Sequence, residues 1–141
     1  MKTISAIVIT KNEEMHIESC IKCLQPFADE VIIFDSMSTD RTGEIATSLG
    51  AKFIPEPIFP GYGPQRIKAQ KHASCDFIFF LDSDERVTPE LAAEIKEFVA
   101  NAKAKRLKVV IDSRSFTLSD LTEIKEHYFE NISLLVSLPL T

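Results

Sequence analysis

The sequence lacks a surplus of positive charge and any long apolar run, and both absences exclude classes of partner. It carries 16 Lys and Arg against 21 Asp and Glu, which gives a formal net charge of −5 over 141 residues. Because no basic face large enough to neutralise several phosphates is visible, we expect no nucleic-acid partner. The apolar runs at 4–9 and 132–138 are too short for a signal peptide or a membrane span, so we expect a cytoplasmic protein.

Cysteine is also scarce, and its odd number argues against a disulfide framework. Three cysteines in a chain without a secretory signal indicate a reducing compartment. Cys20 and Cys23 form a C-x-x-C pair, but Cys20 falls on the apolar stripe of a predicted helix and Cys23 lies off that stripe. With no second cysteine pair and no histidine at ligand spacing, we expect neither zinc nor redox chemistry there.

Motifs of several common enzyme classes are missing. The sequence has no Gly-rich phosphate loop, no G-x-S-x-G and no H-E-x-x-H, which argues against kinase, serine hydrolase and metalloprotease functions. The histidines His16, His72 and His127 lie far apart in the sequence, so we expect surface or packing roles for them.

What the sequence does contain is an alternation of short apolar segments and helical patterns. Strands are predicted at 4–9, 30–34, 51–54 and 77–81, and helices at 12–24, 41–49, 65–74 and 88–102. This alternation predicts an α/β fold with a doubly wound, mostly parallel, Rossmann-like sheet. We expect Asn12 to cap the first helix and Thr88, followed by Pro89, to cap the last one. The segment 55–64, with four prolines and two glycines, is predicted to be a loop of restricted shape.

The most informative stretch is the fourth strand and the two carboxylates that follow it. Five apolar residues at 77–81 indicate a strand buried on both faces, and Asp82 and Asp84 come directly after it. In open α/β sheets ligands bind beyond the carboxyl ends of the strands. If the chain leaves the sheet still extended, both carboxylates point to the same side. Such an all-oxygen site suits Mg²⁺ or Mn²⁺, which take their remaining ligands from water and substrate phosphates.

A third carboxylate, Asp35, ends the predicted strand at 30–34 and is expected to converge with Asp82 and Asp84 on one edge of the sheet. The repulsion among three acids is tolerated only if a cation or donor hydrogens compensate it, and a metal-bound diphosphate would do so. A lone D-x-D occurs often by chance, but its place after a buried strand favours a metal site. Basic residues on the segment before that strand are expected to face the phosphates, namely Arg66, Lys68 and Lys71.

Three segments together resemble family 2 glycosyltransferases of the GT-A fold: AIVITKNEE at 6–14, VIIFDSMSTDRT at 31–42 and FFLDSDE at 79–85. Two more, GYGPQR at 61–66 and DERVTPEL at 84–91, are similar to the bacterial lipopolysaccharide-core β-glucosyltransferase group. The resemblance covers about residues 4–100, in order and with normal spacing.

The resemblance implies a role for each matching residue. Asp35 is implied to recognise the base, normally uracil, while Asp82 holds the ribose and, with Asp84, the divalent cation on the diphosphate. The expected partners are a UDP-sugar donor and a glycan or glycolipid acceptor, whose hydroxyl attacks in an inverting displacement. Because acceptors of this group are lipid-linked, peripheral contact at the cytoplasmic face of the inner membrane is compatible with the sequence. The loop that is implied to cradle the nucleoside comprises Thr10, Lys11, Asn12 and Glu13.

The remainder of the chain does not match the family pattern. Family members place the general base and the acceptor pocket well beyond the D-x-D, and we expect a truncated fold with a donor-binding domain at 1–104 and an atypical tail at 105–141. The basic cluster at 103–108 is expected to be a solvated helix end. In the tail a strand is predicted at 107–111, a helix at 120–130 and a last strand at 132–138, and no glutamate there is assigned as the base.

Three functions therefore compete. The first is a metal-dependent glycosyltransferase, and the second is a truncated remnant that binds a nucleotide diphosphate without transferring sugar. The third is a phosphohydrolase that uses the first Asp of a D-x-D as its nucleophile. That class expects Thr or Val four residues after the nucleophile, where Arg86 stands, which argues against it. Turnover of a sugar nucleotide would separate the first two.

Overall fold

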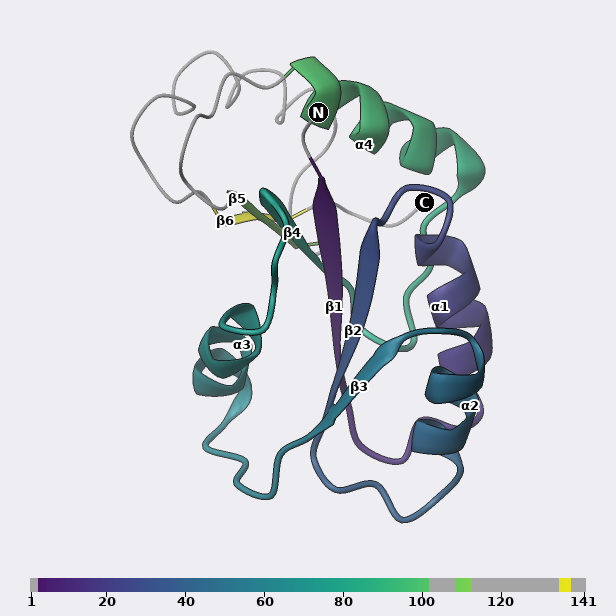
Figure 1. Cartoon of the computed structure of the whole chain (residues 1–141), viewed down its shortest axis with the longest axis vertical. Coiled ribbons are helices and arrows are strands. Elements are labelled where there is room, and N and C mark those ends of the chain that lie inside the picture. The colour runs from purple at the N-terminus through teal and green to yellow at the C-terminus, as the bar shows by residue number, and fades with distance from the viewer. Residues whose placement is uncertain (1–2, 102–108, 113–134, 138–141) are drawn as a thin grey trace.

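The structure, a computed structural model, describes residues 3–101, 109–112 and 135–137 (Figure 1). Its strands form one six-stranded sheet: β1 (Ile4–Thr10), β2 (Glu30–Asp35), β3 (Lys52–Pro55), β4 (Phe77–Phe80), β5 (Val109–Asp112) and β6 (Leu135–Ser137). The helices of the described part are α1 (Ile17–Leu24), α2 (Thr42–Ser48), α3 (Tyr62–Gln70) and α4 (Pro89–Asn101). The predicted doubly wound α/β fold is confirmed.

The strand order places a ligand crevice beside β1. All neighbouring strands are parallel, in the order β3-β2-β1-β4-β5-β6. The chain therefore moves from β1 outward to β3 and then returns to the other side of β1 to form β4. A reversal of this kind opens a crevice outside the carboxyl ends of the two central strands, where ligands of such sheets bind.

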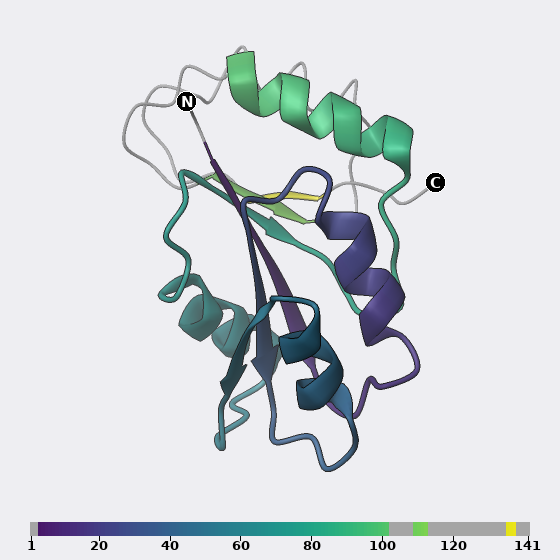
Figure 2. The same ribbon diagram turned by 45° about the vertical axis from the view of Figure 1, so that its right-hand side comes forward.

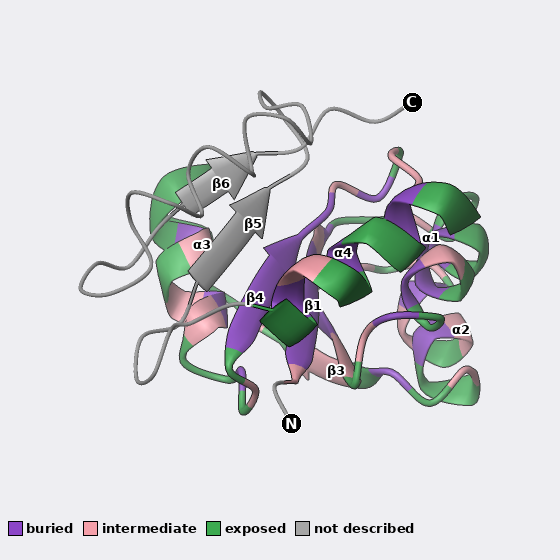
Figure 3. Cartoon of the chain, turned by 90° about the horizontal axis from the view of Figure 1, so that it is seen from above, coloured by how far each residue is buried: buried purple, intermediate pink, exposed green. Residues whose placement is uncertain are grey.

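Helices cover both faces of the sheet, and this explains the continuous apolar strands. Figures 2 and 3 show α3 on one face and α1, α2 and α4 on the other. Because side chains alternate along a strand, Phe77 and Phe79 of β4 join the core under α1 and α4, whereas Ile78 and Phe80 join the core under α3. The prediction that this strand is buried on both faces is confirmed.

The first helix begins later than predicted. Asn12 does not cap it, since α1 starts at Ile17 and the N-cap residue, His16, makes no side-chain capping bond. Asn12 instead has a left-handed φ of 52°, and its amide oxygen accepts a hydrogen bond from the backbone N–H of Thr39 at 2.8 Å. Contacts with the neighbouring loop therefore override the local capping preference of 12–14.

The third helix is also shifted, and it takes three residues from the predicted loop. It spans Tyr62–Gln70 rather than 65–74, and the Gln65 N–H already donates to the Gly61 carbonyl at 2.9 Å. Pro64 is compatible with this start because an N–H in the first turn of a helix has no intrahelical partner. The early start brings Tyr62 onto a helix at the edge of the crevice.

The last described helix begins as predicted. Thr88 caps α4, since its hydroxyl accepts the Leu91 N–H at 3.2 Å, and Pro89 occupies the first helical position. Gly50 directly follows the helix predicted at 41–49 and has a left-handed φ of 83°, which glycine commonly adopts where a helix ends.

The cysteines of α1 lie against the core. Cys20 is fully buried, and Cys23 packs at its edge as a partly buried residue. Burial raises the pKa of the Cys20 thiol to about 12 and also raises the pKa of Cys23. A thiol that stays protonated at neutral pH is a poor metal ligand and a poor nucleophile, so packing is the role that these contacts support.

Two predicted strands of the tail are present in the sheet. Val109–Asp112 and Leu135–Ser137 pair in parallel as β5 and β6, within or beside the predicted segments. The basic cluster at 103–108 and the predicted helix at 120–130 lie outside the described residues. Among the residues that are described, no helix is long and apolar enough to cross a membrane.

A carboxylate at the amino end of the sheet joins three segments. Glu30 Oε2 accepts hydrogen bonds from the Ser5 hydroxyl at 2.6 Å and from the N–H and hydroxyl of Ser74 at 3.0 and 2.8 Å. Burial by itself raises the pKa of this carboxyl, but the bonds from Ser5 and Ser74 outweigh it, so the pKa of Glu30 is lowered from its ordinary value of 4.5.

We predict that Glu30→Gln reduces the loss of stability in acid. Because the folded-state pKa lies below the unfolded one, the unfolded chain binds more protons in that range. The contribution of Glu30 is therefore complete above pH 4.5 and is lost as the pH falls through the lowered value. Urea unfolding from pH 7 to pH 3 should show a shallower decline for Glu30→Gln. Ser5→Ala should give part of the same change, and an unaltered pH profile in both variants would contradict this assignment.

Candidate nucleotide-sugar site

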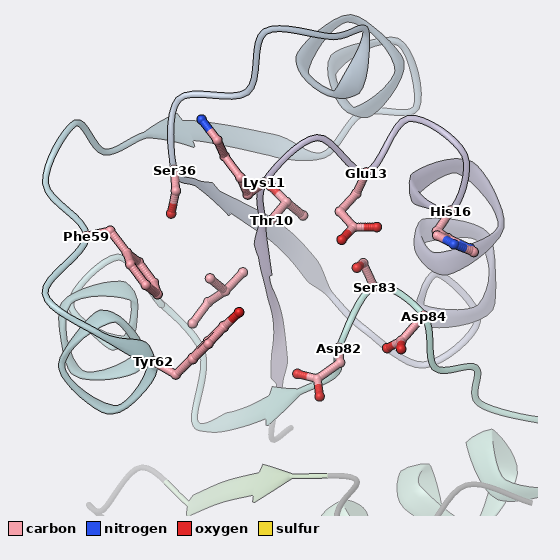
Figure 4. Close-up of a pocket in the computed structure, with 11 residues that line it drawn as sticks. Thr10, Lys11, Glu13, His16, Ser36, Phe59, Tyr62, Asp82, Ser83 and Asp84 are labelled. Carbon is pink, nitrogen blue, oxygen red and sulfur yellow. The ribbon is translucent and has the colours of Figure 1, made fainter.

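One cavity of about 920 Å³ opens at the carboxyl ends of β1 and β4 (Figure 4). It lies at the reversal of strand order, where the topology predicts a ligand site. Its volume suits a ligand of nucleotide size. The lining comes from the end of β1 and the loop after it, the residue after β2, the loop before α3 with the first residue of α3, and the turn after β4. The residues are Ile9, Thr10, Lys11, Glu13, His16, Ser36, Phe59, Tyr62, Asp82, Ser83 and Asp84.

A buried hydrogen-bond cluster fixes the floor of this cavity. Thr10 and Asp35 are paired across β1 and β2, and the Thr10 hydroxyl donates to Asp35 Oδ1 at 2.6 Å. The backbone N–H of Ser38 donates to the other carboxylate oxygen at 2.7 Å, and its hydroxyl donates to Oδ1. Asp35 is only 1% exposed. Its carboxylate therefore links the ends of β1 and β2 by hydrogen bonds and lies beneath the cavity.

The loop after β1 is fastened to the loop after β2 through its backbone. The N–H of Asn12 donates to the Ser38 hydroxyl at 2.7 Å, and the N–H of Glu13 donates to the Thr42 hydroxyl at 2.9 Å. The Lys11 ammonium donates to the Met37 carbonyl at 2.8 Å. These bonds hold Lys11 and Glu13 at the cavity without a helix beneath them.

Asp40 strengthens the same junction. Its carboxylate accepts bonds from the N–H and hydroxyl of Thr42 and from the N–H of Glu14 at 3.1 Å. Although desolvation opposes the shift, these hydrogen bonds lower the pKa of Asp40. The group stays ionised at neutral pH, and it keeps the start of α2 and the end of the β1 loop together.

The two carboxylates of the D-x-D lie on a turn, so the condition of an extended backbone, under which both would point to the same side, does not hold. The Glu85 N–H donates to the Asp82 carbonyl at 2.9 Å, and the Glu85 carboxylate accepts the Asp82 N–H at 3.0 Å. Asp82 and Asp84 nevertheless both line the cavity, and the buried Ser83 between them lines it too.

Basic side chains on α3 make ion pairs and do not line the cavity. Arg66 Nη2 lies 3.5 Å from Asp82 Oδ1, and its guanidinium carbon is 5.1 Å from the centre of the Phe80 ring. Lys68 Nζ is 3.7 Å from Glu56. Arg66, Lys68 and Lys71 are not among the residues that line the cavity, and their approach to the phosphates of a ligand stays a prediction. Arg66 is placed to orient Asp82.

Arg86, to which the sequence analysis gave no role in the site, joins the D-x-D turn to α1. Its guanidinium donates to the carbonyls of Ser83 and Glu85. It also donates to the Ser19 hydroxyl at 2.6 Å and to the His16 carbonyl at 3.0 Å. His16 and Ser83 line the cavity, so Arg86 supports two of its walls from behind.

The structure gathers some of the predicted site residues and separates others. Those that line the cavity are Thr10, Lys11, Glu13, Asp82 and Asp84. Asn12, Asp35 and Arg66 are not in the described lining. All three acids lie at the carboxyl edge of the sheet, where Asp82 and Asp84 line the cavity and Asp35 is buried by its bonds with Thr10 and Ser38.

The carboxylates at the cavity could bind a divalent cation whose remaining ligands come from a substrate. Among residues 3–101, 109–112 and 135–137, no group of three or more His, Cys, Asp and Glu side chains could hold a metal alone. Two carboxylates do line the open cavity, and the Asp82 side chain is 46% exposed. Mg²⁺ and Mn²⁺ commonly take only one or two carboxylates and use phosphates and water for the rest.

Sequence reasoning missed the remaining lining residues. His16 was expected to have a surface or packing role, and Ser36 and Ser83 lie in segments that resemble the family but were given no role of their own. Phe59 and Tyr62 did carry one, since two aromatic residues in a proline-rich segment have few apolar neighbours to pack against. Their place at the cavity follows from the path of the loop before α3, which local patterns do not determine.

Comparison with known proteins gives the family. The sequence model described as Glycosyl transferase family 2 matches residues 5–138, which include the segment after 104 that the motifs left unassigned. A Rickettsia bellii protein described as an uncharacterized glycosyltransferase is 41% identical over 121 residues, covering 82% of this chain and 41% of the relative. Glucosyl-3-phosphoglycerate synthase of Mycobacterium tuberculosis is 37% identical over 94 residues, covering 59% of this chain and 29% of that protein.

Comparison with solved structures supports the same family and fold. A crystal structure of the mycobacterial synthase with Mn²⁺, UDP and phosphoglyceric acid has a TM-score of 0.61 at 28% identity, covering 78% of this chain and 43% of that one. The structure of S. aureus TarS 1–349 has a TM-score of 0.64 at 27% identity, covering 79% and 36%. The chain thus spans about two fifths of the length of the Rickettsia relative. Its motifs, sheet order and matches together show that the chain belongs to glycosyl transferase family 2 and has the GT-A fold.

Proposed function

We propose that the chain binds a nucleotide-diphosphate sugar, with UDP as the nucleotide, as the donor site of a glycosyltransferase. The observation that carries the proposal is the cavity at the carboxyl ends of β1 and β4, lined by Thr10, Lys11 and Glu13 on one strand end and by Asp82 and Asp84 on the other. The mycobacterial synthase, at 28% identity, was crystallised with Mn²⁺ and UDP, which supports the choice of nucleotide.

Asp82 and Asp84 are the proposed ligands of Mg²⁺ or Mn²⁺. A divalent cation bound there would neutralise charge on the departing nucleotide diphosphate. Arg66, 3.5 Å from Asp82, orients one of the two carboxylates. Lys11 adds a positive charge at the cavity edge, which favours the diphosphate electrostatically.

The transfer itself is proposed to be an inverting displacement. The acceptor oxygen forms a bond to the anomeric carbon from the face opposite the diphosphate, whose bond to that carbon breaks. A base must take the hydroxyl proton, and no described residue is assigned to that task. The segments at 61–66 and 84–91 support an acceptor in lipopolysaccharide core or another cell-envelope glycan.

Binding without transfer is the second candidate function. It is kept as an alternative because the general base that sugar transfer needs is not assigned among the described residues. The two candidates differ in turnover: a transferase releases UDP from a UDP-sugar when an acceptor is present, whereas a binding remnant holds UDP and releases no sugar.

We predict that Asp84→Ala abolishes the Mn²⁺-dependent part of UDP binding and leaves the fold intact, because Asp84 is exposed at the cavity. Calorimetry with UDP, with Mn²⁺ and then with EDTA, measures the effect. Glu94→Ala removes an exposed carboxylate from α4, outside the cavity, and is the matched control. Equal UDP affinity in Asp84→Ala and the unmodified chain would remove the metal role, and no UDP binding by the unmodified chain would overturn the proposed function.

Asp35 is proposed to act on the nucleotide through Thr10 and not by contact with the base. Its carboxylate is 1% exposed and accepts bonds from Thr10 and Ser38. A buried charged acceptor of this kind typically contributes about 2 kcal/mol to stability. Removal of the Asp35 carboxylate charge should therefore disturb the whole cavity floor.

For Asp35→Asn we expect a lower free energy of unfolding, by about 2 kcal/mol, and a fall of equal factor in the affinities for UDP and GDP. Titration of both nucleotides against the variant and the unmodified chain gives the ratio. Thr10→Val, which removes only the hydroxyl donor, should act in the same direction. A change in the UDP-to-GDP ratio would show instead that Asp35 reads the base.

Arg86 is proposed as a positioning residue for the D-x-D turn, since it binds the Ser83 and Glu85 carbonyls and anchors them to α1. Arg86→Gln should weaken Mn²⁺-dependent UDP binding by about tenfold, as loss of supporting contacts does at metal sites. Arg41→Gln, which changes an exposed arginine paired with Glu44, is the control. If Arg86→Gln lowers stability while UDP affinity stays as in the control, the residue is merely structural.

A further inference from the structure

Two aromatic side chains form a corner at the edge of the cavity. Phe59 lies in the loop before α3, and Tyr62 is the first residue of α3. Their rings meet edge to face, with centroids 5.2 Å apart and an interplanar angle of 82°. Phe59 is 47% exposed and Tyr62 is 70% exposed, although both line the cavity. We refer to this pair as the aromatic corner.

The exposure of these rings contrasts with the use of aromatic residues elsewhere in the described chain. Phe27, Phe34 and the three phenylalanines of β4 are buried in the core. Exposed large apolar side chains grouped at a cavity usually mark a ligand surface, because burial on binding recovers the hydrophobic free energy. The neighbouring Ile58 is also exposed but does not line the cavity, so the corner is distinct from a general apolar surface.

The corner is held in place before any ligand binds. Prolines at 57, 60 and 64 restrict the backbone around it. The side chain of the buried Gln65 donates to the Ser36 hydroxyl at 3.4 Å, a long bond that still links α3 to the end of β2. A rigid aromatic surface loses little conformational entropy when a planar ring stacks on it.

The cavity therefore has two chemically different sides. Figure 4 shows Phe59 and Tyr62 on one side, and Glu13, His16 and Asp84 on the other. The acidic side suits a metal-bound diphosphate, while the aromatic corner suits the face of a planar ring. A ligand that meets both requirements joins an aromatic ring to a diphosphate, as a nucleoside diphosphate does.

We propose that the nucleobase of the donor stacks on the aromatic corner, so that Phe59 and Tyr62 determine nucleoside affinity. The inference rests on the proposed function. It assigns recognition of the base to the faces of two rings, while Asp35 lies below the cavity floor. Stacking of a base on an aromatic side chain commonly changes affinity by about ten- to a hundredfold.

The test compares ligands with and without the base. Tyr62→Leu and Phe59→Leu should each weaken binding of UDP by about tenfold, with affinity for pyrophosphate and Mn²⁺ unchanged. Tyr62→Phe, which keeps the ring, and Ile58→Ala, which changes the adjacent exposed side chain, should bind UDP like the unmodified chain.

A second measurement uses tyrosine fluorescence. Because the two tyrosines are Tyr62 and Tyr128 and tryptophan is absent, the fluorescence of a Tyr128→Phe chain reports Tyr62 alone. UDP with Mg²⁺ should quench this emission, and pyrophosphate with Mg²⁺ should not.

The possible failures are distinguishable. If the leucine variants bind UDP as tightly as the unmodified chain, or lose UDP and pyrophosphate to the same extent, the stacking assignment is wrong and the donor site stands. If the unmodified chain binds neither UDP nor pyrophosphate with Mn²⁺, the proposed function fails and this inference fails with it.

Discussion

The hydrogen bond from the Thr10 hydroxyl to the buried carboxylate of Asp35 is the contact on which the site depends. It joins the carboxyl ends of β1 and β2, and the bonds of Ser38 to the same carboxylate extend the junction into the next loop. Because the Ser38 hydroxyl also accepts the N–H of Asn12, the same carboxylate helps to fix the direction of that backbone donor. A buried charge that accepts several hydrogen bonds tolerates one geometry, and that geometry defines the cavity floor.

The other half of the site is organised in the same manner. Arg86 holds the D-x-D turn by its carbonyls, and Arg66 pairs with Asp82 from the opposite face of the sheet. The cavity thus lies between two strand ends whose polar groups are already oriented. Such preorganisation lowers the cost of binding a highly charged ligand, since few side chains need to reorder.

Local patterns predicted the elements that depend on local forces. The buried β4 strand follows from five apolar residues, and the start of α4 follows from the capping pattern of Thr88 and Pro89. The start of α1 was mispredicted, because the capping preference of Asn12 lost to hydrogen bonds with residues 26 and 27 positions away. Asp82 and Asp84 both line the cavity at the end of β4, and the backbone that carries them is a turn closed by Glu85.

The sequence alone determined the parallel α/β fold, the family resemblance and the strand ends at which chemistry is expected, because apolar periodicity and adjacent polar residues are properties of short segments. Only the tertiary structure decided which polar groups face the cavity. Asp35 is buried beneath it, Arg66 turns to Asp82, and Phe59 and Tyr62 come to its edge. These outcomes depend on contacts between strand ends that are distant in sequence. A local pattern contains no information about which side chains form those hydrogen bonds and ion pairs.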